Sequence, residues 1–167
     1  MLPGITLRTL KNIYDERGSF VELMRTDWTE LFGEDRISQA NLSQTYPGII
    51  RAWHRHLRGQ IDYFIALQGS IKICAFNDES KELNEIVSNG KSPQIVRIPG
   101  QYWHGFKAIG NQKAMLLYFT TKLYDSSSPD EDRRPWDDPT LIPQKINDRI
   151  DDFRINQPWD WNYPPNK

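Results

Sequence analysis

Short runs of β-type residues, each ended by a turn residue, fill most of this 167-residue chain. Residues 93–100 (PQIVRIPG) and 114–124 (AMLLYFTTKLY) are typical of these runs. Many short strands at nearly even spacing predict a β-sandwich or a small barrel. In residues 62–76, the LQGS sequence predicts a tight hairpin between two strands. The remaining predicted strands are residues 5–10, 19–24, 37–45, 48–56, 82–87 and 103–110.

Helical patterns are few. Residues 25–35 predict one short helix that ends at Gly33. Asp27 is the expected N-cap, with Glu30 three residues later. A weaker pattern over residues 139–153 predicts a second helix.

The composition predicts one globular domain, residues 1–167, with an N-terminal arm over about residues 1–14 and a tail over about residues 143–167. Its 21 basic and 22 acidic residues give a formal net charge of −1, which does not favour a nucleic acid or a membrane as partner. The absence of a signal-like apolar N-terminus predicts a cytoplasmic protein. The single Cys74 is expected to be buried, and the tail's aromatic residues to pack on the barrel exterior or on a partner.

Two of the three histidines lie one residue apart in residues 51–56 (RAWHRH), and the third is His104. Side chains two apart on a strand point to the same face, so His54 and His56 are expected to share one face. The arginines and the tryptophan of this run are then expected on the other face. If the histidine face lines a small barrel, it lies in a concave pocket of the kind that binds small ligands.

Two chemistries fit this pattern. The spacing His54-x-His56-x3-Gln60, with His104 on a later strand, resembles the metal motif of cupin barrels. Imidazoles suit Zn, Fe, Ni or Mn, although Gln60 stands where the motif has a carboxylate. Histidine also suits proton transfer, because it changes charge near neutral pH. A metal site at these four residues and an acid–base site both stay open.

Six segments of the chain, spanning about residues 12–142, resemble the dTDP-4-dehydrorhamnose 3,5-epimerase family of cupin-type enzymes. They are DERGSFVEL (15–23), QANLS (39–43), GIIRAWH (48–54), IPGQYWHGF (98–106), LLYFTTKLY (116–124) and PWDDPTL (135–141). The resemblance implies an all-β cupin or jelly-roll barrel with one or two short helices, and a homodimer. It also implies a dTDP-linked sugar substrate, no metal or other cofactor, and a place in deoxysugar and polysaccharide biosynthesis.

The resemblance implies three catalytic residues. His54 matches the family's base, Asp138 the carboxylate that orients this base, and Tyr118 the proton donor on the other face of the sugar. In a 4-keto sugar the C–H bonds at C3 and C5 are acidic, so a base can remove a proton and leave an enolate. Protonation from the opposite face then inverts the carbon, which implies an epimerase acting at C3, C5 or both.

The resemblance also implies a substrate-binding set. Arg51 matches an arginine near the diphosphate. Arg17 and Glu22 match a nucleotide-binding loop that the family often receives from the partner subunit. The whole implied set is Arg17, Glu22, Gln39, Asn41, Arg51, His56, Gln60, His104 and Tyr124.

Several positions depart from the family pattern. Ala52 replaces a glycine next to the base, and Gln60 replaces a lysine near the C4 oxygen of the sugar. Ile73 stands where the acidic partner of that lysine is expected. His56 also gives RAWHRH a likeness to the dTDP-sugar 3,4-ketoisomerases. Three alternatives therefore stay open: a 3,4-ketoisomerase, a metal-dependent cupin enzyme, and a catalytically weak sugar-nucleotide-binding relative.

Overall fold

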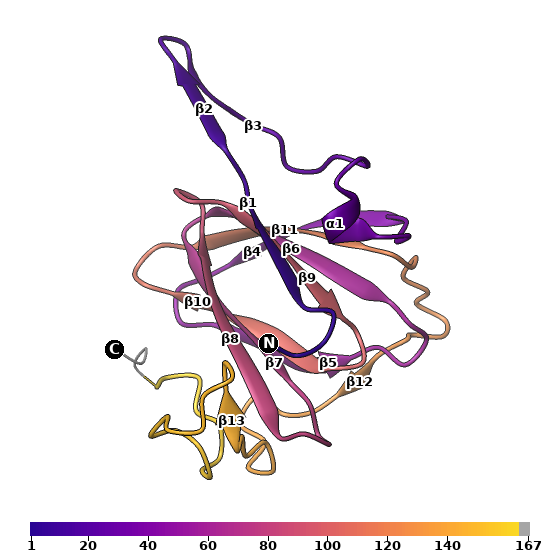
Figure 1. The fold of residues 1–167 in the computed structure, drawn as a ribbon, viewed down its shortest axis with the longest axis vertical. Coiled ribbons are helices and arrows are strands. Elements are labelled where there is room, and N and C mark those ends of the chain that lie inside the picture. Colours follow the sequence, from indigo (N-terminus) through magenta and orange to yellow (C-terminus); the bar gives the residue numbers. More distant parts are fainter. Residues whose placement is uncertain (164–167) are drawn as a thin grey trace.

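Two β-sheets face each other across one apolar core in the computed structural model, which describes residues 1–163 (Figure 1). The predicted all-β class is confirmed. The five-stranded sheet has the order β1 (Thr6–Thr9), β9 (Gln94–Pro99), β6 (Ile61–Gln68), β11 (Ala114–Thr120) and β4 (Gln39–Thr45). The six-stranded sheet has the order β12 (Asp132–Arg133), β5 (Ile50–Arg55), β10 (Trp103–Ile109), β7 (Ser70–Phe76), β8 (Glu82–Asn89) and β13 (Lys145–Ile146). A separate hairpin pairs β2 (Asn12–Asp15) with β3 (Gly18–Val21).

Alternation along the strands decides which side chains enter the core. In β6, Phe64 and Ala66 join the cluster between the sheets, whereas Tyr63 and Ile65 join the cluster on the outer face. Fully burying a side chain as large as Phe64 contributes about 1.5–3 kcal/mol, so a shift of register by one residue would be costly.

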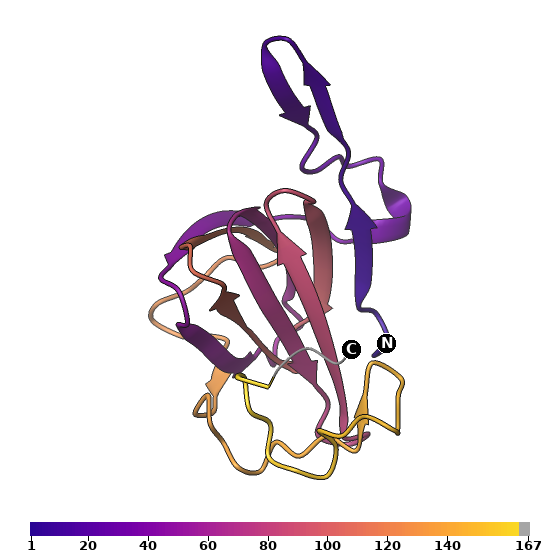
Figure 2. The same cartoon turned by 90° about the vertical axis from the view of Figure 1, so that its left-hand side faces the viewer.

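Both outer faces of the pair of sheets are partly covered. The helix α1 (Thr29–Phe32) packs on the five-stranded sheet, and the segment after β12 packs on the six-stranded sheet (Figures 1 and 2). Trp159 and Trp161 in that segment are 4% and 1% exposed and pack with Trp53. Cys74 is buried in the same cluster. The predictions for the thiol and for these two tail aromatics are confirmed, while residues 164–167 of the tail lie outside the described residues.

Of the two predicted helices, only the first forms. α1 ends before Gly33 as predicted, but its N-cap is Trp28, because the carboxylate of Asp27 binds Arg25 instead. The second prediction is wrong: residues 139–153 form turns and the short strand β13. Pro143 interrupts the helical pattern there, and pairing with β8 satisfies the backbone instead. Within residues 1–163 no helix is long and apolar enough to cross a membrane.

The LQGS turn does not form the predicted hairpin. β6 belongs to the five-stranded sheet and β7 to the six-stranded one, so this turn carries the chain from one sheet to the other. Gly69 has φ 69°, and a Cβ there would lie 2.6 Å from the carbonyl oxygen of Lys113. A glycine therefore permits both the left-handed backbone and the close approach of the two segments.

The β2–β3 hairpin projects away from both sheets (Figures 1 and 2). Tyr14 and Phe20 on this hairpin are 71% and 61% exposed. A lone two-stranded hairpin is marginally stable in water.

Candidate active site

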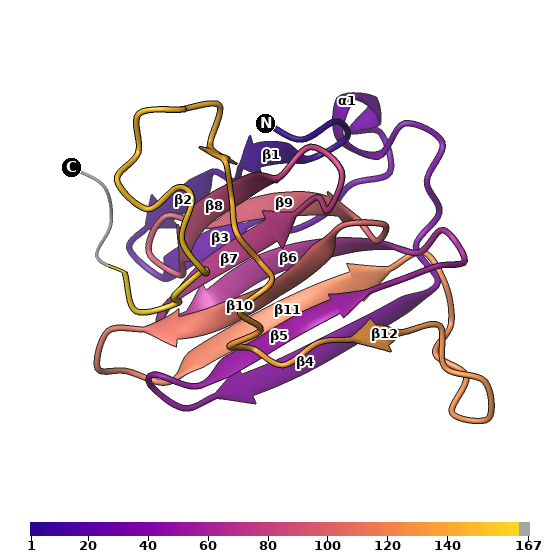
Figure 3. The ribbon, with the colours of Figure 1, turned by 90° about the horizontal axis from the view of Figure 1, so that it is seen from below.

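A cavity of about 900 Å³ lies between the two sheets. Strands β4, β6 and β11 supply one wall and β5 supplies another. The wall segment, residues 121–134, runs from β11 to β12, which lies beside β5 at the edge of its sheet (Figure 3). The volume is in the range of pockets for small ligands and cofactors.

The wall segment is anchored by Asp130. Its carboxylate accepts hydrogen bonds from the backbone amides of Leu57 (2.9 Å) and Arg58 (3.0 Å). The Arg58 guanidinium in turn donates to the carbonyl oxygen of Ser128 at 2.6 Å. These bonds hold the wall segment against the turn between β5 and β6.

A β-bulge turns both Arg51 and His54 toward the cavity. β10 pairs with β5 at each of these residues, with two β5 residues but only Gly105 of β10 between them. Regular alternation predicts that Arg51 lies on the outer face of the sheet. This prediction is wrong, because the extra residue of β5 at the bulge turns Arg51 toward the cavity. A Cβ on Gly105 would lie 2.4 Å from the Cβ of Ala52, which explains the glycine at this bulge.

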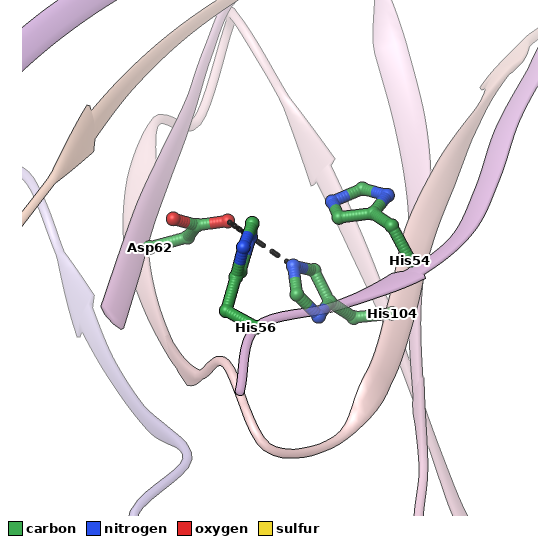
Figure 4. A group of neighbouring side chains, drawn as sticks. All are labelled: His54, His56, Asp62 and His104. Atoms are coloured by element: carbon green, nitrogen blue, oxygen red, sulfur yellow. Dashed lines mark hydrogen bonds and ion pairs between the residues drawn. The ribbon is translucent and has the colours of Figure 1, made fainter. Parts of the chain in front are cut away.

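The three histidines and Asp62 form a cluster beside the cavity (Figure 4). One ligand atom from each of the four residues lies within 4.8 Å of the others. Asp62 Oδ2 is 3.1 Å from Nε2 of His104 and 3.5 Å from Nε2 of His56. His54 packs edge-on against His104, with ring centroids 4.2 Å apart. Asp62 is nearly inaccessible to water, so the histidines compensate its charge.

Backbone carbonyls orient two of these rings. Nδ1 of His56 is 2.6 Å from the carbonyl oxygen of Asp130, and Nδ1 of His104 is 2.8 Å from that of Tyr102. A carbonyl oxygen only accepts, so each Nδ1 carries a hydrogen. The Nε2 atoms of both rings are left to face Asp62.

Burial and neighbouring charges set the protonation of the site. Burial, together with repulsion from His104, holds the pKa of His54 well below its usual value of 6.5. Burial opposes ionisation of Asp62, but hydrogen bonds from His104 and His56 outweigh it and hold the pKa of this carboxyl well below 3.8. Burial raises the pKa of Tyr118 above 10.0, and Asp62 adds to the effect. His54 is therefore a neutral imidazole and Tyr118 a neutral phenol at pH 7.

A group that we call the arginine clamp supports the histidine strands from the outer face. The guanidinium groups of Arg55 and Arg134 lie over the ring of Trp103, at 4.5 and 4.1 Å from its centroid. Asp78 binds Arg134 at 2.7 Å and accepts a hydrogen bond from the indole of Trp103 at 2.7 Å. Arg55 also binds Asp132 of β12 at 3.0 Å. The clamp joins β5, β10 and β12.

Most residues that the sequence predicts for the site come together. His54, Tyr118, Gln39, Asn41, Arg51, His56, Gln60 and Tyr124 line the cavity, and His104 completes the cluster beside it. Arg17 and Glu22 do not line the cavity of their own chain. Arg17 binds Asp15 at the hairpin tip, and Glu22 binds Arg25.

Among the described residues, no hydrogen bond joins Asp138 to His54. Its carboxylate accepts hydrogen bonds from the backbone and hydroxyl groups of Thr140 and lies 3.8 Å from Arg134. It therefore shapes the turn after the wall segment. Among the residues that the structure describes, Asp62 is the carboxylate closest in position to the histidines.

The sequence did not lead us to Asp62, although a signal was present. It is the acidic residue of an otherwise apolar strand, two positions after Gln60 and so on the same face. Ile73, at the position where an acidic residue was expected, is fully buried in the core. The carboxylate is thus supplied by β6 rather than by β7.

The cluster has the composition of a transition-metal site. Three imidazoles and a carboxylate are the ligands that Zn, Fe, Mn or Ni accept, and they lie close enough to share one ion. Gln60, which the cupin spacing placed among the ligands, instead donates from its amide to Asp62 at 2.8 Å. The candidate ligands are therefore His54, His56, Asp62 and His104.

Comparisons with known proteins agree with the sequence motifs. A family model described as "Polysaccharide biosynthesis C-terminal domain" matches residues 13–131. The "Probable low-salt glycan biosynthesis epimerase Agl13" of Haloferax volcanii is 43% identical over 138 residues, which cover 80% of this chain and 87% of that protein. The "Spore coat polysaccharide biosynthesis protein SpsL" of Bacillus subtilis is 33% identical over 146 residues, which cover 84% and 94%.

A solved structure supports the same relationship. The dTDP-6-deoxy-D-glucose-3,5-epimerase RmlC of Legionella pneumophila, in complex with dTDP-4-keto-L-rhamnose, superposes with a TM-score of 0.74. It is 25% identical, over 84% of this chain and 77% of that one. The predicted resemblance to cupin-type sugar epimerases is confirmed, as is the isomerase class.

Proposed function

Because the chain belongs to the polysaccharide biosynthesis C-terminal domain family, we propose that it inverts C3, C5 or both in a nucleotide-linked 4-keto-6-deoxyhexose. The nucleotide we propose is dTDP, as in the ligand of the Legionella enzyme. A cytoplasmic location, a single domain and the roles of individual residues stay predictions.

One observation carries the proposal: His54 and Tyr118 line one cavity from two different sheets. A sugar between them exposes one face to a neutral imidazole and the other to a neutral phenol. His54 Nδ1 or Nε2 removes the proton from C3 or C5, and Tyr118 returns a proton from the opposite face. Inversion needs this arrangement, because a base and an acid on the same face would restore the original configuration.

Basic side chains suit the other end of the substrate. Arg51, Arg58 and Arg133 line the same cavity. Guanidinium groups bind phosphate oxygens through paired hydrogen bonds, so these residues are suited to the diphosphate. Arg51 is oriented by a 3.1 Å hydrogen bond to the hydroxyl of Thr45.

We further propose a homodimer in which the β2–β3 hairpin reaches the partner's cavity. The exposed Tyr14 and Phe20 support this, because a projecting apolar hairpin needs a surface to cover it. The hairpin carries Arg17, which binds Asp15 and does not line the cavity of its own chain. A second copy would then supply the nucleotide-binding arginine.

Hydrogen exchange tests the proposed reaction. The protein is incubated with dTDP-4-keto-6-deoxyglucose in D2O, and deuterium at C3 and C5 is followed by NMR. His54→Ala should lower both deuterium incorporation and epimer formation by about 10²- to 10⁴-fold. Tyr118→Phe should lower epimer formation more than deuterium incorporation, because the base remains.

Tyr46→Phe is the matched control, since Tyr46 is 69% exposed and does not line the cavity. Wild-type protein without exchange at either carbon contradicts the proposal. A product with its keto group at C3 identifies a 3,4-ketoisomerase, and ligand binding without exchange identifies a weakly catalytic relative.

A second candidate, a metal-dependent enzyme, is favoured by the compact cluster of three histidines and Asp62. Metal analysis of the purified protein separates the two. About one Zn, Fe, Mn or Ni per chain, lost together with activity in His104→Ala or Asp62→Ala, supports the metalloenzyme. Exchange that survives removal of metal by a chelator contradicts it.

A further inference from the structure

Gln60 places an uncharged amide against two residues of the histidine cluster, His56 and Asp62. It lines the cavity together with His54, His56 and Asp62, and its amide contacts the last two. Its backbone carbonyl accepts a hydrogen bond from Gly100 at 2.9 Å, and the carbonyl of Gly100 accepts one from His56 at 2.7 Å. A Cβ on Gly100 would lie 2.4 Å from that Gln60 oxygen. The backbone at Gln60 is therefore held closely against the turn that carries His56.

The amide nitrogen of Gln60 is committed to the protein. It donates to Asp62 Oδ1 at 2.8 Å and lies 3.0 Å from His56 Nε2. The other oxygen of Asp62, Oδ2, faces Nε2 of His104 at 3.1 Å, so Oδ1 is the oxygen that accepts from the amide. Turning the amide over would place its oxygen against a carboxylate oxygen, which is repulsive. The orientation of the side chain is thus fixed by Asp62.

The second polar atom of the Gln60 side chain is its amide oxygen, Oε1. Among residues 1–163, no hydrogen bond reaches Gln60 Oε1, whereas both polar contacts of the side chain use its nitrogen. A carbonyl oxygen can only accept. A keto oxygen also only accepts, so Gln60 cannot stabilise the keto group of a sugar through this atom.

We propose that Gln60 is a specificity-determining residue that offers its amide oxygen to the cavity and selects a sugar with a hydroxyl group at C2 or C3. The inference rests on the proposed function and adds the chemical identity of a substrate group. A substrate hydroxyl donates to Oε1, while Asp62 keeps the acceptor in place. A deoxy analogue leaves the oxygen unpaired inside a partly buried site.

Deoxy analogues test this without changing the protein. Deuterium exchange at C5 is measured for a nucleotide-linked 4-keto-6-deoxyhexose and for its 2-deoxy and 3-deoxy forms, all of which keep the C5 hydrogen. Loss of a hydrogen bond that leaves an acceptor unpaired costs about 1–3 kcal/mol, so one analogue should lose about 10- to 100-fold in kcat/KM. Equal kcat/KM for all three substrates overturns the inference.

The variant Gln60→Leu completes the comparison. It should lower kcat/KM for the hydroxylated substrate and process that substrate and the affected analogue equally. Gln68→Leu, at the far end of β6 and outside the cavity, should keep the wild-type preference. Gln60→Met replaces the leucine variant if thermal melting shows that the latter is unfolded. A Gln60 variant that keeps the wild-type preference overturns the inference, whereas wild-type protein without exchange on any substrate contradicts the proposed function instead.

Discussion

At the scale of single residues, the site depends on how burial and neighbouring charges set the protonation of His54 and Asp62. His54 stays neutral because it is desolvated and lies beside His104. Asp62 stays charged because two histidines hydrogen-bond to it or lie against it. A neutral imidazole next to a compensated carboxylate is ready to accept a proton at pH 7 without first losing one.

The dependence of the reaction on pH follows from these shifts. His54 acts when deprotonated, and its lowered pKa keeps it so down to a pH below 6.5. Tyr118 acts as an acid when protonated, and its raised pKa keeps it so up to a pH above 10.0. We expect kcat/KM for C5 exchange to form a plateau that extends beyond both values. Burial opposes the charge of His56, but Asp62 outweighs burial and raises the pKa of this second imidazole above 6.5, so the measurement is made in His56→Asn as well. A rate that falls as pH drops through 6.5 in both proteins would contradict the role of His54.

The residue scale also shows where sequence patterns succeed and fail. His54 and Tyr118 lie on regular strands, so alternation and motif order were enough to bring them to one cavity. Asp138 follows a proline-rich turn, whose path depends on Arg134 and Thr140 and cannot be read from spacing. Asp62 was missed because a carboxylate in an apolar strand reveals its partners only after the strands pair.

At the scale of elements, the arginine clamp fixes the strands that carry the histidines. Trp103 precedes His104 in β10, and Arg55 follows His54 in β5, so the clamp holds each histidine strand by the residue next to its ring. Asp78 and Arg134 come from outside those strands. Such local support restricts how far the histidine rings can move.

The clamp makes a prediction about stability. Burial opposes the charge of Asp78, but hydrogen bonds from Arg134 and Trp103 outweigh it and lower the pKa of this carboxyl. Its stabilising contribution is therefore present above the unfolded value of 3.8 and lost as pH falls through the lower folded value. Asp78→Asn should reduce the free energy of unfolding by about 1 kcal/mol at pH 7.

Urea unfolding at pH 7 and at a pH well below 3.8 measures this difference. The loss of unfolding free energy in Asp78→Asn should be smaller at the acid pH, because residue 78 is then neutral in both proteins. Asp137→Asn, at an exposed neighbouring turn, is the matched control. An effect of the same size at both pH values would show that the charge of Asp78 contributes nothing.

At the scale of the whole molecule, the sequence indicated strands but not their neighbours. The order β5-β10-β7-β8 places strands from distant parts of the chain side by side. Turn composition suggested that β6 and β7 pair, whereas Gly69 sends the second strand into the other sheet. Pairing depends on which apolar faces can meet, and only the folded chain brings those faces together.

The proposed dimer can be tested by complementation between two inactive variants. Arg17→Ala removes the hairpin arginine and His54→Ala the base, so a mixed dimer would hold one complete site if the hairpin acts in the partner. Co-expression should restore about a quarter of wild-type exchange, since half the dimers are mixed and each has one active site. No recovery, with dimers confirmed by sedimentation, would place Arg17 outside the partner's site.

The contact between His56 and Asp130 has a consequence for mutational surveys. The acceptor is the backbone carbonyl of Asp130, so every residue type at this position keeps it. Substitutions there remove the carboxylate that anchors the wall segment to the turn at residues 57 and 58, which weakens the support of this carbonyl but does not delete it. A one-residue insertion or deletion in the wall segment, by contrast, withdraws the carbonyl and frees the imidazole. Substitutions leave the length of the wall segment unchanged. The length of this segment is therefore the feature that secures the orientation of His56.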